Sequence, residues 1–282
     1  MSDIIINSII IVGVMGMAAA IILFMVAKKF HVHEDPRIEK VEEELPGANC
    51  GGCGYPGCRA FAEALVNAED ISDMHCPVSN KEDMDKIAAI LGKEFGDQEP
   101  LVAVVRCAGS PDKRPKTNIY DGASSCTIAS SLYTGESGCP NGCLGMGECV
   151  EACNFDAIHM NTETQLPEVT DYKCTACNAC VVACPRDIIE LRKKNKKDRK
   201  IFVSCINEEK GGVARKNCKV ACIGCGKCVK VCPFDAITLE NNLAYIDPYK
   251  CRLCRKCAPE CPTNAILEIN FPVKKQKEAT AE

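Results

Sequence analysis

The chain begins with a nearly unbroken apolar stretch over residues 4–27, interrupted only by Asn7 and Ser8. Its 24 residues are enough to cross a bilayer as a helix. Asp3 precedes the stretch and Lys28 and Lys29 follow it, so the positive-inside rule predicts an N-terminus outside the cell membrane and a cytoplasmic remainder. A cleaved signal peptide is the alternative, but no basic residue precedes the stretch and no A-x-A site follows it.

Small residues cluster in the middle of this stretch: Gly13, Gly16, Ala18, Ala19 and Ala20. Small side chains let membrane helices pack closely, which favours other membrane subunits as neighbours. A lone anchor that faces lipid is the alternative. The stretch contains no carboxylate, so one such helix predicts an anchor and not an ion path.

Beyond residue 28 the pattern becomes that of short, polar elements. The charged segment HEDPRIEKVEEEL predicts a solvated helical stalk that ends at Pro46-Gly47. KEDMDKIAAILGKEF predicts a helix near residues 80–95, and LVAVVRC predicts a strand that ends at Cys107. Residues 192–200 carry seven basic side chains, which predict a solvated connector. A docking patch for an acidic electron carrier is the alternative.

Composition changes this picture mainly through cysteine. The 282 residues include 24 cysteines, no tryptophan and 5% aromatic residues, so a large aromatic core is excluded. The net charge of −4 gives no electrostatic case for a nucleic-acid partner. Because the cytoplasm is reducing, so many cysteines there are expected to bind metal and not to form disulfides.

Two parts of the chain repeat each other. CLGMGECVEACNFDAI at residues 143–158 and CIGCGKCVKVCPFDAI at residues 222–237 match at 10 of 16 positions. YKCTACNACVVACP at residues 172–185 matches YKCRLCRKCAPECP at residues 249–262 at both Tyr-Lys pairs and every cysteine. Cysteines at 126, 139 and 143 and at 205, 218 and 222 share a 13-then-4 spacing. Such self-similarity predicts two tandem modules of one construction.

Three runs follow the C-x2-C-x2-C-x3-C-P pattern of two-cluster bacterial ferredoxins, in which three cysteines bind one cubane and the fourth binds the other. They are Cys174, Cys177, Cys180 and Cys184; Cys222, Cys225, Cys228 and Cys232; and Cys251, Cys254, Cys257 and Cys261. The crossing rule predicts that Cys261 completes the Cys222 set and that Cys232 completes the Cys251 set. Zinc also uses C-x2-C pairs, but zinc ribbons need no four-cysteine run closed by proline.

A differently spaced block precedes these runs and contains Cys50, Cys53, Cys58 and Cys76. Its GANCGGCGYPGC loop places glycines where backbone must bend closely around a metal. Cys76-Pro77 closes the set from a distance. One 4Fe-4S cubane is predicted here, with a structural zinc site as the alternative.

The first copy of the repeat is irregular, because Met146 occupies the position of Cys225. A thioether is a poor replacement for a thiolate on a low-potential cubane. Cys139 is the nearest substitute, since Gly142 allows the bend, and another upstream cysteine is the alternative. The predicted sets are Cys139, Cys143, Cys149 and Cys184, and Cys153, Cys174, Cys177 and Cys180.

These assignments give five 4Fe-4S clusters from twenty cysteines. Four cysteines remain, which allow a sixth cluster: Cys107, Cys126, Cys205 and Cys218. Buried free thiols are the alternative. Cys205 aligns with Cys126 by spacing but with Cys107 by its preceding strand.

The order of an apolar anchor, the GANCGGCGYPGC…HCP block and ferredoxin-like modules resembles the B subunit of the Rnf complex, a membrane-bound ferredoxin:NAD+ oxidoreductase that pumps sodium ions or protons. The resemblance implies a subunit of an ion-translocating oxidoreductase that takes electrons from reduced ferredoxin and relays them to partner subunits. The shortest family members carry one ferredoxin module, whereas this chain has two. An iron–sulfur subunit of a hydrogenase or formate dehydrogenase, and a zinc-stabilised membrane scaffold, are the alternatives.

The chain carries no catalytic constellation of its own. The glycines of GCLGMGEC are interleaved with cysteines and do not open a helix after a strand, so direct nucleotide binding is not expected. The predicted fold class is α+β, with one transmembrane helix, a small helical four-cysteine domain and two tandem ferredoxin-like modules. The predicted bounds are an anchor over residues 1–27, a stalk over 28–46, the four-cysteine domain over 47–97, the first module over 98–193, a basic linker over 194–200, the second module over 201–271 and a disordered tail over 272–282.

Overall fold

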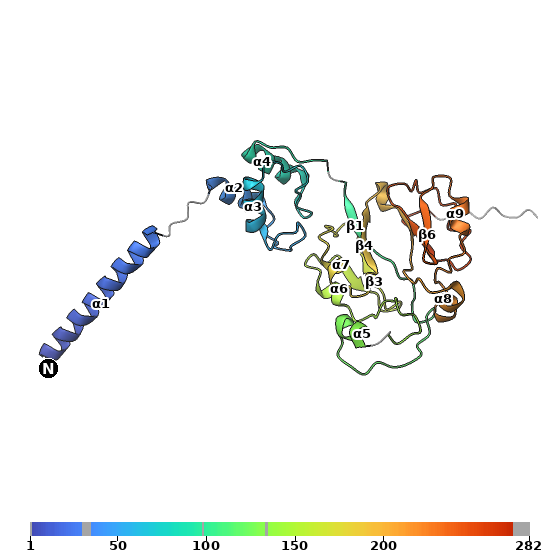
Figure 1. Ribbon diagram of the computed structural model, residues 1–282, viewed down its shortest axis with the longest axis horizontal. Helices are drawn as coiled ribbons and strands as arrows, with labels where there is room; N and C mark the ends of the chain where they lie inside the picture. The colour runs from blue at the N-terminus through green and yellow to red at the C-terminus, as the bar shows by residue number, and fades with distance from the viewer. Residues whose placement is uncertain (1, 30–34, 98, 133–134, 273–282) are drawn as a thin grey trace, which may run out of the picture.

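The computed structural model describes residues 2–29, 35–97, 99–132 and 135–272. Helix α1 (Ser2–Lys29) lies apart from the other elements and ends on Lys28 and Lys29 (Figure 1). Over the part of the chain that the structure describes, no helix is both long and apolar enough to cross a membrane. The predicted anchor is therefore not shown by the structure. The predicted tail lies outside the described residues, except for Pro272.

Three helices form a small domain of their own: α2 (Pro36–Glu44), α3 (Cys58–Asn67) and α4 (Lys81–Leu91). Asp35 begins α2 by accepting a hydrogen bond from the Arg37 amide, and Asn80 begins α4 in the same way. The buried core includes Val41, Phe61 and Ile87. Part of the segment predicted as a solvated stalk, helix α2, therefore packs into the helical domain through Val41.

The first ferredoxin-like module contains β1 (Leu101–Val105), α5 (Cys126–Leu132), α6 (Glu148–Glu151), β2 (Ile158–Met160), β3 (Pro167–Val169), α7 (Ala179–Val182) and β4 (Ile189–Lys193). Strand β1 pairs antiparallel with β4, and β2 pairs antiparallel with β3. The predicted strand LVAVVRC forms β1, and its apolar residues Val102 and Val104 are buried. The short helices α6 and α7 each begin inside a cysteine run, so they position the later cysteines of these runs.

The second module repeats this construction with β5 (Lys200–Val203), α8 (Gly211–Asn217), α9 (Lys227–Val231), β6 (Ile237–Glu240), β7 (Leu243–Ile246) and β8 (Ile266–Ile269). Strand β5 pairs antiparallel with β8, and β6 pairs antiparallel with β7. The strand pairing of β1–β4 is thus repeated by β5–β8. Two tandem modules are therefore present, as the repeat in the sequence predicts, and they lie side by side (Figure 1).

The basic run at residues 192–200 is largely built into the contact between the modules. Arg192 is 3% exposed, donates to the Ile246 carbonyl and lies over the ring of Tyr245. Lys200 is 5% exposed and pairs with Asp171. Only the turn around the short 3-10 helix η1 (Lys196–Asp198) presents exposed lysines. The prediction of a solvated linker is wrong for the two ends of this run, because both face the neighbouring module.

Candidate metal centres

The four cysteine runs share one backbone conformation. The residues on either side of the second ligand position have positive φ in every run: Gly145 and Gly147, Ala176 and Asn178, Gly224 and Gly226, and Leu253 and Arg255. This conformation costs a non-glycine residue about 1–2 kcal/mol, and strain of this kind concentrates at functional sites. The backbone at Met146 therefore follows that at Cys177, Cys225 and Cys254, although its side chain is a thioether.

In the second module the thiols gather in two crossed sets. Burial raises the pKa of the Cys228 thiol to about 11, and three nearby cysteines contribute: Cys222, Cys261 and Cys225. Burial also raises the pKa of the Cys251 thiol, with contributions from Cys254 and Cys232. The fold thus brings the last cysteine of each run to the other run. The Ala265 amide donates to Cys261 Sγ at 3.2 Å, and hydrogen bonds to sulfur tune the potential of a bound cluster.

In the first module one small hollow is lined by four cysteines: Cys153, Cys174, Cys177 and Cys180. Burial raises the pKa of the Cys180 thiol to about 12, with Cys174 and Cys177 as the next contributors. The amides of Ala157 and Ala103 donate to Cys153 Sγ at 3.4 Å and to Cys174 Sγ at 3.5 Å. The hollow therefore combines four thiols with two sulfur-directed amides.

The first cysteine block, which contains Cys50, Cys53, Cys58 and Cys76, lies against this hollow. Asn49 Oδ1 accepts a hydrogen bond from the Cys58 amide at 2.8 Å, which closes the glycine-rich loop. A Cβ on Gly52 would lie 2.8 Å from the Cys177 carbonyl oxygen, so only glycine fits there. Burial raises the pKa of the Cys50 thiol, and both Cys177 and Cys76 contribute to the rise. The loop of the helical domain thus contacts the first module at a cysteine of its regular run.

The irregular run, residues 143–153, lies close to Cys126, the first residue of helix α5. Burial raises the pKa of the Cys149 thiol to about 11, and the next contributors are Cys184 and Cys126. Glu148, beside Cys149, accepts hydrogen bonds from the Thr127 amide at 3.1 Å and the Thr127 hydroxyl at 2.8 Å. These bonds hold the start of α5 against the run. Sequence spacing alone gave no sign of this contact.

The remaining extra cysteines lie around a separate hollow between the modules. Its lining includes Cys107, Cys139, Cys205 and Cys218. Burial raises the pKa of the Cys205 thiol to about 12 and, among the cysteines, Cys222 and Cys139 contribute. Cys139 therefore lies with the cysteines left over by the regular runs, and it also neighbours the second module.

All 24 cysteines are free thiols. Within the described ranges, no three His, Cys, Asp or Glu side chains are close enough to bind one metal ion. Four thiolates on a single zinc would lie about 4 Å apart, because a Zn–S bond is about 2.3 Å long. A 4Fe-4S cubane places each thiolate on a different iron, so its ligands are spread more widely around a hollow.

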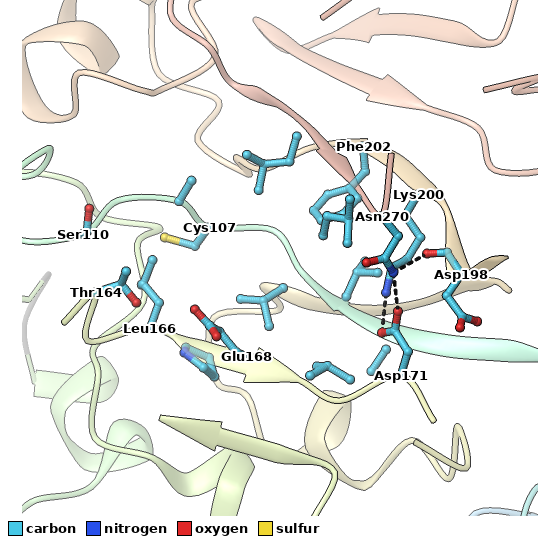
Figure 2. Close-up of a pocket in the computed structure, with 18 of the residues that line it drawn as sticks. Cys107, Ser110, Thr164, Leu166, Glu168, Asp171, Asp198, Lys200, Phe202 and Asn270 are labelled. Carbon is cyan, nitrogen blue, oxygen red and sulfur yellow. Dashed lines mark hydrogen bonds and ion pairs between the residues drawn. The ribbon is translucent and has the colours of Figure 1, made fainter. Parts of the chain in front are cut away.

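A cleft of about 620 Å³ lies between the modules, and Cys107 is the one cysteine among the residues that line it. Figure 2 shows Asp171, Lys200, Asn270 and Asp198 linked at one end, with Cys107 away from them on the wall. The Lys200 ammonium lies 2.5 Å from Asp171 Oδ1, and Asn270 Nδ2 donates to the Asp198 carbonyl at 2.9 Å. These four residues are thus paired with each other, and the Lys200–Asp171 pair joins the two modules.

Three family models match parts of the chain. They are "Putative Fe-S cluster" over residues 45–78, "4Fe-4S double cluster binding domain" over residues 173–235 and "4Fe-4S dicluster domain" over residues 221–265. The chain is also 45% identical over 256 residues to the B subunit of the Na(+)-translocating ferredoxin:NAD(+) oxidoreductase complex of Acetobacterium woodii, a match that covers 91% of this chain and 75% of that protein. The chain belongs to the family of Rnf complex B subunits.

Two further relatives in this family match nearly end to end. The B subunit of the ion-translocating oxidoreductase complex of Methanosarcina acetivorans is 39% identical over 94% of this chain and 99% of that protein. The B subunit of the proton-translocating ferredoxin:NAD(+) oxidoreductase complex of Clostridium ljungdahlii is 38% identical over 92% of this chain and 91% of that protein. The family resemblance read from the anchor, the first block and the ferredoxin-like modules is therefore confirmed.

Proposed function

We propose that this chain relays electrons from reduced ferredoxin to other subunits of an ion-translocating ferredoxin:NAD+ oxidoreductase complex of the Rnf type. The observation that carries this function is the set of cysteine loops of one backbone conformation, gathered around hollows in a chain of this family. Bound 4Fe-4S clusters would supply one-electron storage at low potential. Among the residues that the structure describes, we identify no constellation for bond chemistry.

We assign four ligand sets from the cysteine runs, and the thiol neighbours described above support them. They are Cys50, Cys53, Cys58 and Cys76; Cys153, Cys174, Cys177 and Cys180; Cys222, Cys225, Cys228 and Cys261; and Cys232, Cys251, Cys254 and Cys257. A fifth set is built on Cys143, Cys149 and Cys184. The residues fit the group, because each thiol set comes with a tight loop and two of the sets have backbone amide donors at sulfur.

The protein would set the spacing between bound clusters and the environment of each one. Cys177 touches the loop of the first block, and Cys180 has Cys149 as a neighbour from the next set. Cys257 has Cys228 as a neighbour in the same way. The first block therefore adjoins the first module, and the sets within each module adjoin one another, as a relay requires. Because the buried thiols have raised pKa values, cluster binding must also release protons from them.

We also propose that α1 anchors the chain in the cell membrane, with its N-terminus outside and the cysteine-rich part in the cytoplasm. Support comes from the apolar run over residues 4–27, from Lys28 and Lys29 after it, and from exposed apolar side chains such as Leu23 and Phe24. The run contains no carboxylate, so the ion path must be formed mainly by other subunits.

The test of the relay uses the purified, cluster-loaded full chain mixed anaerobically with reduced ferredoxin at low salt. Bleaching of the chain's visible absorption, with matching reoxidation of ferredoxin, is the expected result. No transfer at low salt would refute the ferredoxin role. The anchor is tested by alkaline carbonate extraction of membranes, and release of the full chain into the supernatant would refute it.

A further inference from the structure

A hollow between the modules gathers four cysteines that the regular runs leave over. Its lining contains Cys107 and Cys139 from the first module and Cys205 and Cys218 from the second. The last three are buried, with exposures of 7–9%. Burial raises the pKa of the Cys218 thiol, and Cys107 and Cys139 both contribute. The four thiols therefore face one another across the contact between the modules.

These four cysteines form two equivalent pairs. Cys107 follows the end of β1 by two residues, and Cys205 follows the end of β5 by two residues. Cys139 precedes Cys143 by four residues, and Cys218 precedes Cys222 by four. Since β1–β4 and β5–β8 are the same strand pair in the two modules, each module supplies the same two ligands. Of the two alignments that the sequence allows for Cys205, the structure therefore supports the one with Cys107, which is based on the preceding strand.

Buried polar groups surround this hollow. The Asn207 side chain is 1% exposed, and its Nδ2 donates to Cys139 Sγ at 3.7 Å. Arg106, next to Cys107, donates to the Cys205 carbonyl at 3.2 Å, and so fixes ligands of both modules together. Arg114 lowers the pKa of the Cys139 and Cys218 thiols by its charge, against the larger opposing effect of burial. Hydrogen bonds to sulfur and a nearby cation both suit an anionic thiolate-bound cluster.

Cys126 has a different position and a different neighbour. It lies at the start of α5, beside Cys149, which also has Cys184 as a neighbour, and the next residue, Thr127, is held by Glu148. Met146 occupies the second ligand position of that run, with the same flanking backbone as Cys225. Cys143 and Cys184 thus both neighbour Cys149, and Cys126 is an upstream cysteine close to Cys149.

We infer that Cys107, Cys139, Cys205 and Cys218 bind a 4Fe-4S cluster between the two modules, and that Cys126, not Cys139, completes the set of Cys143, Cys149 and Cys184. This inference rests on the proposed function as an iron–sulfur electron carrier. Sequence spacing instead predicts Cys139 as the ligand that completes the Cys143 set and Cys126 as a ligand of the sixth cluster. All 24 cysteines then serve as ligands, in six sets of four.

The test is iron and sulfide quantitation with EPR on the anaerobically reconstituted full chain. We expect about 24 irons in the unsubstituted chain and about 20 in Cys139→Ser or Cys218→Ser. The double variant Cys139→Ser/Cys218→Ser should match either single variant in iron content and EPR spectrum, because both residues bind the same cluster. The combination Cys126→Ser/Cys139→Ser should fall to about 16 irons.

A rescue variant separates ligation from folding. Met146→Cys should restore iron to Cys126→Ser, because it returns a thiolate to the second ligand position, whereas the matched Met146→Leu should not. Met146→Cys should not restore the iron that is lost in Cys139→Ser. Rescue of Cys139→Ser instead, or a double variant Cys139→Ser/Cys218→Ser with twice the loss of either single variant, would overturn the inference.

The two levels of proposal fail differently in this experiment. About 20 irons in the unsubstituted chain would remove the cluster between the modules and leave the electron-carrier function intact. A chain that reconstitutes with zinc alone and gains no visible absorption would remove the function itself.

Discussion

The ion pair between Lys200 and Asp171 offers a direct test of how the modules are joined. Lys200 begins β5 of the second module, and Asp171 follows β3 of the first. Their side chains are 6% and 13% exposed, and the ammonium lies 2.5 Å from Oδ1. Asn270 donates to the other carboxylate oxygen at 3.3 Å. Lys200→Met keeps most of the aliphatic side chain and removes the charge.

The expected cost follows from what is left behind. Removing one partner of a buried ion pair costs about 3–5 kcal/mol, because the other charge stays buried. Asn270 still donates to Asp171, and one hydrogen bond of this kind offsets about 1 kcal/mol. We therefore expect Lys200→Met to destabilise the contact between the modules by about 2–4 kcal/mol. Lys200→Met/Asp171→Leu should cost less than Lys200→Met alone, since no unpaired charge remains.

Native-state hydrogen exchange measures this locally. The amides of β5 and β8 should lose protection by a factor of about 30 to 1,000, at about 1.4 kcal/mol per tenfold change. The amides of α2, α3 and α4 should be unchanged, because those helices have a separate core. The matched control is Lys173→Met, which breaks an exposed pair with Asp156, where the side chains are 37% and 89% exposed. An exposed pair contributes about 0–1 kcal/mol.

Two outcomes would refute the reasoning. If Lys200→Met reduces protection no more than Lys173→Met, Lys200 is not a buried structural cation. If Lys200→Met/Asp171→Leu costs as much as the sum of its single variants, the two side chains do not interact. Either outcome would remove the Lys200–Asp171 pair as a structural link between the modules.

Four further predictions follow from the same contacts. Val41→Ala should lower the urea midpoint of the helical domain, at a cost of about 1–3 kcal/mol, because Val41 is fully buried; no change would restore a solvated stalk. The cluster-free chain should lose stability as pH rises from about 9 toward 12, because the unfolded chain releases its thiol protons before the folded chain, in which the pKa values of buried thiols such as Cys180 and Cys257 are raised to about 12. Urea midpoints at about pH 8 and about pH 10.5 should therefore differ for the cluster-free chain and much less for the loaded chain, whose thiolates are bound to iron. Asn207→Ala should lower the midpoint potential of one EPR-visible cluster and leave the others unchanged, because an N–H···S bond to Cys139 is lost; a uniform shift would contradict this assignment. Lys196→Ala/Lys197→Ala should slow association with ferredoxin at low salt if the exposed turn is a docking site, and an unchanged rate would exclude it.

The cysteine runs could be read from the sequence because their information is local. Spacings of two, two and three residues confine the cysteines to one loop, and the fold adds only the crossing of the fourth ligand. The strand just before Cys107 was readable for the same reason, since β1 is a short apolar run whose central residues are buried, although it ends at Val105 and not at Cys107. Both features depend on residues that are neighbours in the chain.

Features that depend on distant neighbours could not be read in this way. Arg192 belongs to a basic run in the sequence, but its partners are Tyr245 and the Ile246 carbonyl in the other module. The α2 segment is rich in glutamate, yet Ile38, Val41 and Leu45 recur at helical spacing and all three are buried. In that segment the apolar periodicity indicated a buried helix face, whereas the high glutamate content favoured the wrong prediction of a solvated helix.

The placement of Cys139 shows that proximity along the chain does not decide which thiols lie together in the fold. Cys139 is the nearer upstream cysteine to the irregular run, but the thiols around it come from Cys107 and from the second module. Each module supplies only two of the four cysteines around that hollow, so neither could complete a cubane there alone. Binding of a cluster at this site and docking of the modules must then stabilise each other, because a ligand that binds only the docked form favours that form. Loosening the contact at Lys200 should weaken iron retention at this site before any other, and loss of this cluster should in turn reduce the protection of β5.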